Sequence, residues 1–346
     1  MRHSFAWARS LAHRPTFSGS YLQKLEHQEN HLWFQTSVKD ISVSNKRTLH
    51  LIANTRSGRG NGSELAALAK TLCEEAGAKL KIYEVGEPSE LAKLARQAVD
   101  NSVDENDIVV AAGGDGTLRT VAEVMRGSKA SYAVVPSGTF NYFARAHRIP
   151  EDQTEALKLA LTGKPKPIRL GEINGRTFVI NASLGLYAKA IQEREAKRKI
   201  FGRFKIVSVL SSGLTLLGRH KNLHVKMDSD HFQSELKTPM IFIGNNALQL
   251  RNLSLSVAEG FKENKLAVVM LKPLKGVEML RILFRGIFKT LEHEEKLSQF
   301  SVESLKIETK IKDQKVALDG EMFDMKSPYE IKSTFGEVHM ISLAKD

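Results

Sequence analysis

The stretch Val109–Met125 reads VVAAGGDGTLRTVAEVM, and it decides how the rest of the chain is interpreted. The run Asp107–Ala112, which leads into it, is rich in β-branched residues and is typical of a buried strand. The apolar residues of Thr117–Met125 then recur at helical spacing, as Leu118, Val121, Ala122 and Met125. The stretch therefore predicts a strand, a tight loop and a helix.

The loop between that strand and helix is Gly113-Gly114-Asp115-Gly116-Thr117. Its three glycines let backbone N–H groups turn toward a bound anion, and the following helix offers its positive end. Asp115 adds a carboxylate where phosphates would bind, so a divalent cation between them would balance the charges. The loop predicts a phosphate and metal site, and the alternative is a tight turn with Asp115 as a helix cap.

Composition limits the class of protein. The chain has 346 residues, enough for two domains, and no apolar run approaches the ~20 residues that cross a bilayer. The single cysteine, Cys73, excludes an internal disulfide and fits a reducing compartment. We therefore expect a cytoplasmic protein without a transmembrane segment.

The net charge of +12 points to a polyanionic partner, which is a nucleotide, an anionic membrane surface or nucleic acid. Nucleic acid ranks last, because the sequence has neither an aromatic-interleaved RNA motif nor zinc-knuckle spacing.

Residues 1–46 differ from the rest. They contain both tryptophans, Trp7 and Trp33, and have no acidic residue before Glu26. We expect an N-terminal extension outside the fold, and a transit peptide or a start codon placed too far upstream are the alternatives.

From Arg47 onward, strand-like and helix-like segments alternate. The predicted strands are Thr48–Ala53, Lys79–Val85, Asp107–Ala112 and Tyr132–Pro136, and the predicted helices are Glu64–Ala76, Ser89–Val99, Thr117–Met125 and Glu151–Leu161. This alternation favours an α/β domain with a parallel sheet covered on both faces. Polar loops follow the first, third and fourth strands, so all three meet at the carboxyl edge, where such sheets bind ligands.

The stretch Lys164-Pro165-Lys166-Pro167 predicts a boundary, with domains at residues 47–165 and 166–346. Beyond it, Asn174-Gly175 separates Ile168–Ile173 from Thr177–Ile180 and predicts a hairpin. Further predicted strands are Leu223–Met227, Met240–Gly244, Leu266–Leu271, Leu305–Glu308 and Lys315–Leu318. The second domain is therefore expected to be mostly antiparallel.

Four motifs in order resemble the diacylglycerol kinase catalytic-domain family, which includes bacterial soluble lipid kinases and sphingosine kinases. They are Asn54-x-x-Ser57-Gly58, Gly113-Gly114-Asp115-Gly116-Thr117, Pro136-x-Gly138-Thr139-x-Asn141 and Asp319-Gly320-Glu321. The resemblance covers roughly Arg47–Ala344. It implies an α/β nucleotide-binding domain and a β-sandwich lipid-substrate domain, whose last strand returns to the first domain.

The resemblance also implies an ATP- and Mg²⁺-dependent lipid kinase of phospholipid biosynthesis, with a hydroxyl of diacylglycerol or a related lipid as acceptor. The nucleotide-binding residues that it implies are Asn54, Ser57, Gly58, Gly113, Gly114, Gly116, Thr117, Thr139 and Asn141. Asp319, Glu321 and Asp115 are the candidate catalytic residues, since a carboxylate can accept the proton of a lipid hydroxyl. Asp115 is also the candidate metal ligand.

Three departures from the family pattern stand out. Thr55 occupies the usual position of proline, and Tyr142 that of aspartate. The region Glu259–Asn264 has few carboxylates where bacterial members form a structural magnesium site. Two other functions therefore stay open: an NAD kinase, which shares the glycine loop, and a catalytically silent nucleotide- or lipid-binding regulatory protein.

Two basic segments predict how a protein without a membrane span would reach a lipid. Lys199, Arg203 and Lys205 surround apolar residues, and Leu274–Leu291 has an apolar helical face beside a basic stripe. Both fit peripheral association with an anionic membrane surface, and the alternative is that both apolar faces pack inside the second domain. A homodimer is compatible with the sequence.

Overall fold

The structure is a computed structural model that describes residues 47–54, 62–186, 188–189, 222–229, 232–246, 264–273 and 296–343. The chain divides after Ser44, and every described residue belongs to the larger unit, Asn45–Asp346. The predicted N-terminal extension and the two basic segments lie outside the described residues.

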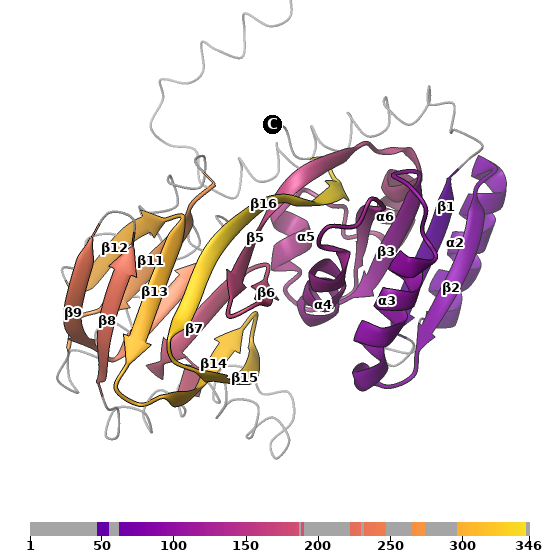
Figure 1. Ribbon diagram of the computed structural model, residues 1–346. Helices are drawn as coiled ribbons and strands as arrows, with labels where there is room; N and C mark the ends of the chain where they lie inside the picture. The colour runs from indigo at the N-terminus through magenta and orange to yellow at the C-terminus, as the bar shows by residue number, and fades with distance from the viewer. Residues whose placement is uncertain are drawn as a thin grey trace, which may run out of the picture. The chain divides into compact units, whose positions relative to one another are not determined.

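The first part of this unit alternates strands and helices (Figure 1). Its elements are β1 (Thr48–Asn54), α2 (Gly62–Ala76), β2 (Lys79–Val85), the 3₁₀ turn η1 (Pro88–Glu90), α3 (Leu91–Asp100), β3 (Asp107–Gly113), α4 (Asp115–Met125), β4 (Ser131–Pro136), α5 (Tyr142–Ala146) and α6 (Gln153–Thr162). Strands β2, β1, β3 and β4 pair in this order, and every pairing is parallel. The predicted α/β fold is confirmed.

The helices pack in two pairs, α2 with α6 and α3 with α4. All residues of β3 and β4 are buried, as expected for parallel strands that are covered on both faces. All four predicted helix starts were off by two residues: α2 and α4 begin earlier than predicted, and α3 and α6 begin later. Pro88 opens a 3₁₀ turn that precedes α3, and α6 begins at Gln153, where the Asp152 side chain accepts a hydrogen bond from the Glu155 N–H (3.0 Å).

The second part consists mainly of antiparallel strands. They are β5 (Pro165–Ile173), β6 (Arg176–Phe178), β7 (Asn181–Gly185), β8 (Leu223–Ser229), β9 (Gln233–Thr238), β10 (Met240–Gly244), β11 (Leu266–Leu271), β12 (Leu297–Val302), β13 (Ser304–Thr309), β14 (Asp313–Leu318), β15 (Glu321–Lys326) and β16 (Tyr329–Ile341). Strands β12, β11, β10, β7, β14 and β15 form a six-stranded sheet in this order. Strands β5, β6, β8, β9, β13 and β16 belong to the sheet of the parallel strands.

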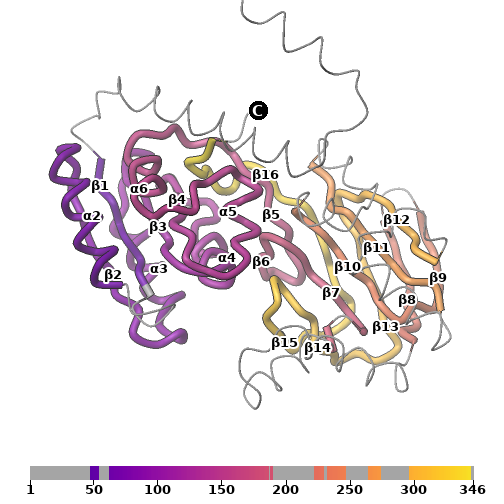
Figure 2. Tube along the Cα trace, turned by 180° about the vertical axis from the view of Figure 1, so that it is seen from behind, coloured from indigo at the N-terminus to yellow at the C-terminus, as the bar shows by residue number. Residues whose placement is uncertain are grey.

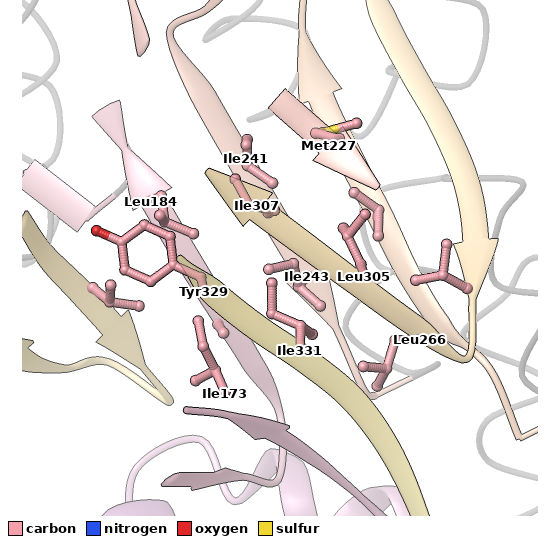
Figure 3. Packing of buried hydrophobic residues seen from close by; sticks show 14 of the residues in the cluster. Ile173, Leu184, Met227, Ile241, Ile243, Leu266, Leu305, Ile307, Tyr329 and Ile331 are labelled. Atoms are coloured by element: carbon pink, nitrogen blue, oxygen red, sulfur yellow. The ribbon is translucent and has the colours of Figure 1, made fainter. Parts of the chain in front are cut away.

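A hydrophobic core joins the two sheets. Figure 3 shows side chains from both sheets together, such as Ile241 and Leu266 from one and Ile307 and Ile331 from the other. All four are at most 2% exposed, so the two sheets pack face to face. This arrangement confirms the expected antiparallel second part with a sandwich-like core.

Strand β16 connects the two parts of the fold (Figure 1). It pairs antiparallel with β13 and β5, and near its end Met340 pairs in parallel with Tyr132 of β4. The proline-rich stretch Lys164–Pro167, predicted to mark a domain boundary, contains the start of β5, which pairs with β16 up to Pro165. The domain limits themselves stay a prediction.

The predicted hairpin after β5 is confirmed. Asn174 and Gly175 have φ angles of 48° and 81°, the two positive values that a tight two-residue turn requires. Five strands had no predicted range: β7, β9, β12, β15 and β16. Strands β9, β12 and β15 lie at sheet edges, where exposed polar residues obscure the strand pattern.

Candidate active site

The glycine loop follows β3 and opens α4, as predicted, but the helix begins two residues earlier, at Asp115. Gly113, Gly114 and Gly116 do not have positive φ angles. Their missing side chains permit close contacts instead. A Cβ atom on Gly113 would lie 2.6 Å from the Thr117 side chain, and one on Gly116 would collide with the Glu321 carboxylate. Packing therefore requires glycine at 113, whereas the half-exposed Glu321 side chain could move away from a Cβ at 116.

The loop after β4 lies directly against the glycine loop. A Cβ atom on Gly138 would be 2.9 Å from the Gly114 Cα, so the two loops touch at these glycines. Asn141 has a left-handed φ of 49°, and its Oδ1 accepts a hydrogen bond from the Gly138 N–H (2.9 Å). The Asn141 side chain therefore holds its own loop, while Thr139 is exposed and available to a ligand.

Asp115 connects the two loops. Its carboxylate oxygens accept hydrogen bonds from the backbone N–H groups of Tyr142 (3.2 Å) and Phe143 (3.1 Å) at the start of α5. Burial raises the pKa of Asp115, although the two N–H groups oppose that shift. Asp115 thus caps a neighbouring helix rather than its own, and its role as metal ligand or base stays a prediction.

Asp319 and Gly320 form the tight turn between β14 and β15, with φ angles of 49° and 91°. The Asp319 carboxylate accepts hydrogen bonds from three successive backbone N–H groups, those of Val179 (2.8 Å), Ile180 (2.7 Å) and Asn181 (2.8 Å). Burial raises the pKa of Asp319 to about 7 against the effect of these donors. The residue is both a turn former and a candidate base.

Glu321, which follows the Asp319-Gly320 turn, contacts both α4 and the glycine loop. Its Oε2 accepts a hydrogen bond from Nη2 of Arg119 on α4 (2.8 Å), and its Oε1 lies against Gly116. Figure 2 shows the β14–β15 hairpin beside β6 and α4. The structure therefore places the second, third and fourth motifs next to one another.

Arg119 is the residue of this region that the sequence did not reveal. Its side chain is 5% exposed, and its guanidinium lies 5.1 Å from the ring centroid of Phe323. The available signal was its position on α4, four residues after Asp115 and four before Glu123. That signal is weak, because helical arginines usually face solvent.

Of the motif Asn54-x-x-Ser57-Gly58, the structure describes only the backbone of Asn54. Asn54 ends β1, which pairs in parallel with β3, so its backbone lies at the same carboxyl edge as the glycine loop. The Asn54 side chain, Ser57 and Gly58 lie outside the described residues. Their predicted contacts with a nucleotide stay predictions.

The described residues contain no cluster of three or more His, Cys, Asp or Glu side chains that could hold a metal. Mg²⁺ in kinases uses one or two carboxylates together with waters and substrate phosphates, and Asp115 as its ligand stays a prediction. Most of the region Glu259–Asn264, considered for a structural metal, lies outside the described residues.

His147 is half-buried and packs edge-on against Phe143, with 4.9 Å between ring centroids. Burial lowers the pKa of His147 to about 4, and the charge of Arg169 acts in the same direction. Its imidazole is therefore neutral at physiological pH and is no cation for phosphate binding.

Comparison with known proteins finds similarity to one family. A sequence model of the diacylglycerol kinase catalytic domain matches residues 48–173. The chain is 34% identical over 191 residues to a Pseudomonas aeruginosa protein named "Probable lipid kinase YegS-like", covering 54% of this chain and 61% of that protein. It is 24% identical over 297 residues to a Bacillus subtilis diacylglycerol kinase, covering 84% of this chain and 95% of that protein.

The fold is also found among solved structures. The crystal structure of a diacylglycerol kinase from Bacillus anthracis superposes with a TM-score of 0.64 at 22% identity, covering 86% of this chain and 96% of that one. None of the described helices is long and apolar enough to cross a membrane. The match over the loops that meet at Gly114 and Gly138 confirms the resemblance seen in the sequence: residues 48–173 match the diacylglycerol kinase catalytic-domain model.

Proposed function

We propose that this protein is an ATP-dependent lipid kinase that transfers the γ-phosphate to a hydroxyl of diacylglycerol or a related lipid. The observation that carries the proposal is the meeting of three motifs at the start of α4. Gly138 lies against Gly114, and Glu321 lies against Gly116. A phosphate-binding loop and two carboxylates on a distant turn are thereby adjacent, as phosphoryl transfer requires.

In this proposal the first turn of α4 binds nucleotide phosphates. The N–H groups of Asp115, Gly116 and Thr117 precede the first i→i−4 hydrogen bond of the helix, which Leu118 donates to Gly114 (3.0 Å). Thr139, exposed on the neighbouring loop, adds a hydroxyl. Mg²⁺ held at Asp115 would neutralise the phosphate charge and polarise the transferred group.

The acceptor hydroxyl has a high pKa, so its attack is helped by a carboxylate that takes up its proton. Asp319 suits this role because its pKa of about 7 keeps it partly deprotonated and moderately basic near neutral pH. All three carboxylates accept hydrogen bonds, Glu321 from Arg119, Asp115 from two α5 N–H groups and Asp319 from three N–H groups, so these contacts do not choose between them and the raised pKa does. We therefore assign Asp319 as the general base.

The test is incubation of the full chain with γ-labelled ATP, Mg²⁺ and an extracted lipid mixture. Label in an organic-soluble product supports the proposed kinase. Label in NADP, when NAD is added, would assign the chain to NAD kinases instead. Nucleotide binding without transfer to either acceptor would indicate a silent binding protein.

The lipid acceptor requires access to a membrane, and we propose that basic residues supply it. The net charge is +12, and Lys199, Arg203 and Lys205 accompany Ile200 and Phe201 in the sequence. Each basic residue near an anionic leaflet contributes about 1 kcal/mol. Changing Lys199, Arg203 and Lys205 to Glu should weaken co-sedimentation with phosphatidylserine vesicles in a salt-dependent way, while transfer to a short-chain lipid is retained. Unchanged sedimentation would exclude this cluster from docking.

A further inference from the structure

One buried arginine links the glycine-loop helix to the catalytic turn. Arg119 on α4 is 5% exposed, and its Nη2 donates to Oε2 of Glu321 on β15 at 2.8 Å. The two residues are separated by 202 positions in the sequence. Strand β15 is at the edge of its sheet and pairs there with β14. The contact with Arg119 is therefore an additional anchor for the β14–β15 hairpin.

The guanidinium of Arg119 is fixed from several sides. It lies 5.1 Å from the Phe323 ring centroid, and its Nη1 is 3.8 Å from Oε2 of Glu123. Its Nη2 also contacts the Thr120 hydroxyl at 3.2 Å. A buried charge costs stability unless it is paired. Acidic partners on α4 and β15 pair the charge of Arg119 and hold its guanidinium in one orientation.

The carboxylate that Arg119 holds is the one that touches the loop. Glu321 Oε2 faces the guanidinium, while its Oε1 lies against Gly116 in the first turn of α4. The Glu321 side chain is nevertheless 49% exposed. Without Arg119, this carboxylate would be free to turn into solvent, and its position against Gly116 would be lost.

We propose that Arg119 is a positioning residue that holds Glu321 against Gly116 and thereby fixes the Asp319-Gly320-Glu321 turn relative to the bound nucleotide. The inference rests on the proposed kinase function and adds a residue to it. Arg119 is buried behind Glu321 and needs no contact with substrate. It acts on the rate of transfer through the geometry of the turn, because a displacement of about 1 Å at a reacting group costs up to ~100-fold in rate.

The first experiment compares Arg119→Met with Arg119→Lys and with a matched control. Arg176→Met is the control, because Arg176 lies over the same Phe323 ring (5.5 Å) and pairs with the same Glu123 (3.6 Å). Arg119→Met should lower kcat by ~10–100-fold and leave the KM for ATP within ~3-fold. Arg119→Lys should recover part of kcat, and Arg176→Met should stay within about 2-fold of the wild type.

A double-mutant cycle tests whether Arg119 acts through Glu321. If it does, Arg119→Met/Glu321→Gln should be no slower than the slower of the two single variants. Losses that multiply in the double variant would overturn the proposal. So would a loss confined to the KM for ATP, or an equal loss in Arg176→Met.

Hydrogen exchange separates this inference from the kinase assignment. If the wild type transfers no label to lipid, the proposed function fails, and the positioning role is then judged by exchange alone. Arg119→Met should speed exchange in peptides covering 113–118 and 319–326 together, by ~5-fold or more, and Arg176→Met should not. Unchanged exchange in either peptide, or the same increase in the control variant, would overturn it.

Discussion

At the scale of single residues, Asp319 both shapes a turn and supplies a buried carboxylate. A single substitution by alanine would disturb both roles at once. Its left-handed φ of 49° shapes the turn, and its carboxylate binds three backbone N–H groups of residues 179–181. Alanine would strain the turn and leave those donors unpaired. Asparagine and glycine both tolerate a positive φ. Substitution by either residue therefore removes the carboxylate without straining the backbone of the turn.

We predict that Asp319→Asn lowers kcat by at least ~100-fold and leaves the Kd for ATP within about 3-fold, because the base acts on the acceptor. Asp319→Gly should lose the same activity with the turn preserved. Isothermal titration with ATP and transfer assays measure the two quantities. Loss of ATP binding in both variants would show that Asp319 contributes to nucleotide binding and is not the base that acts on the acceptor.

The pKa of Asp319 sets a pH dependence. A general base works in its deprotonated form, so kcat/KM should rise with pH through about 7, where burial places the pKa of Asp319. Below that pH the rate should fall about tenfold per unit, as for loss of one required charge. Profiles measured from pH 5 to 9 that stay flat through 7 would assign the base to another residue.

At the scale of elements, the site depends on two loops in contact. A Cβ atom on Gly138 would lie 2.9 Å from the Gly114 Cα and 2.8 Å from Asn141 Oδ1. Gly138→Ala should therefore force the loops apart, raise the Kd for ATP at least ~10-fold and lower stability by about 1–3 kcal/mol. Gly86→Ala is the control, since its Cβ would meet only the Glu90 carboxylate at 3.3 Å. Equal effects of the two variants would contradict the loop contact.

Three strands are joined by a buried histidine away from this edge. His50 of β1 is 0% exposed, with Nδ1 3.1 Å from the Tyr83 hydroxyl on β2 and Nε2 3.7 Å from Asp107 on β3. Burial lowers the pKa of His50 from its ordinary value of 6.5, although Asp107 opposes the shift. Below pH 6.5, His50 therefore binds a proton more readily in the unfolded chain than in the folded chain. The free energy of unfolding consequently falls as the pH falls.

We predict that His50→Gln removes part of this acid sensitivity. The free energy of unfolding of the wild type should drop between pH 6.5 and 5 by at most about 1.4 kcal/mol per pH unit for this one group, and that slope should diminish in the variant. Urea titrations at pH 5, 6, 7 and 8 measure it. His339→Gln, at an exposed position of β16, should leave the slope unchanged. An identical slope in all three proteins would show that His50 titrates as it does in the unfolded chain.

At the scale of the whole molecule, the sequence predicted what is local and missed what is distant. The strand–loop–helix at Gly113, the hairpin at Asn174 and the parallel sheet follow from periodicity and turn chemistry within short windows. The pairing of Arg119 with Glu321 and the three bonds from residues 179–181 to Asp319 join segments 138 to 202 residues apart. No local pattern encodes such partners. Pro165 and Pro167, which predicted a domain boundary, lie at the start of β5 beside β16.

A second arginine of α4 joins the parallel strands to the antiparallel part. Arg126, the C-cap of α4, donates from Nε to Glu337 of β16 and from Nη2 to Glu172 of β5, both at 2.5 Å. The two carboxylates raise the pKa of Arg126 against the effect of burial. Glu172, whose side chain is 13% exposed, also pairs with Lys332 (3.3 Å). The glycine-loop helix is thereby held at both ends, by Arg119 and by Arg126.

We predict that Arg126→Met lowers the free energy of unfolding by about 2–4 kcal/mol, because it leaves two carboxylates at the joint without their shared cation. Arg145→Met is the matched control. Its partner Glu151 is 3.7 Å away and both side chains are exposed, so its loss should cost at most about 1 kcal/mol. Urea unfolding followed by fluorescence and by circular dichroism gives both values. Equal losses in the two variants would mean that Arg126 is a solvated surface charge that does not stabilise the connection between the two parts.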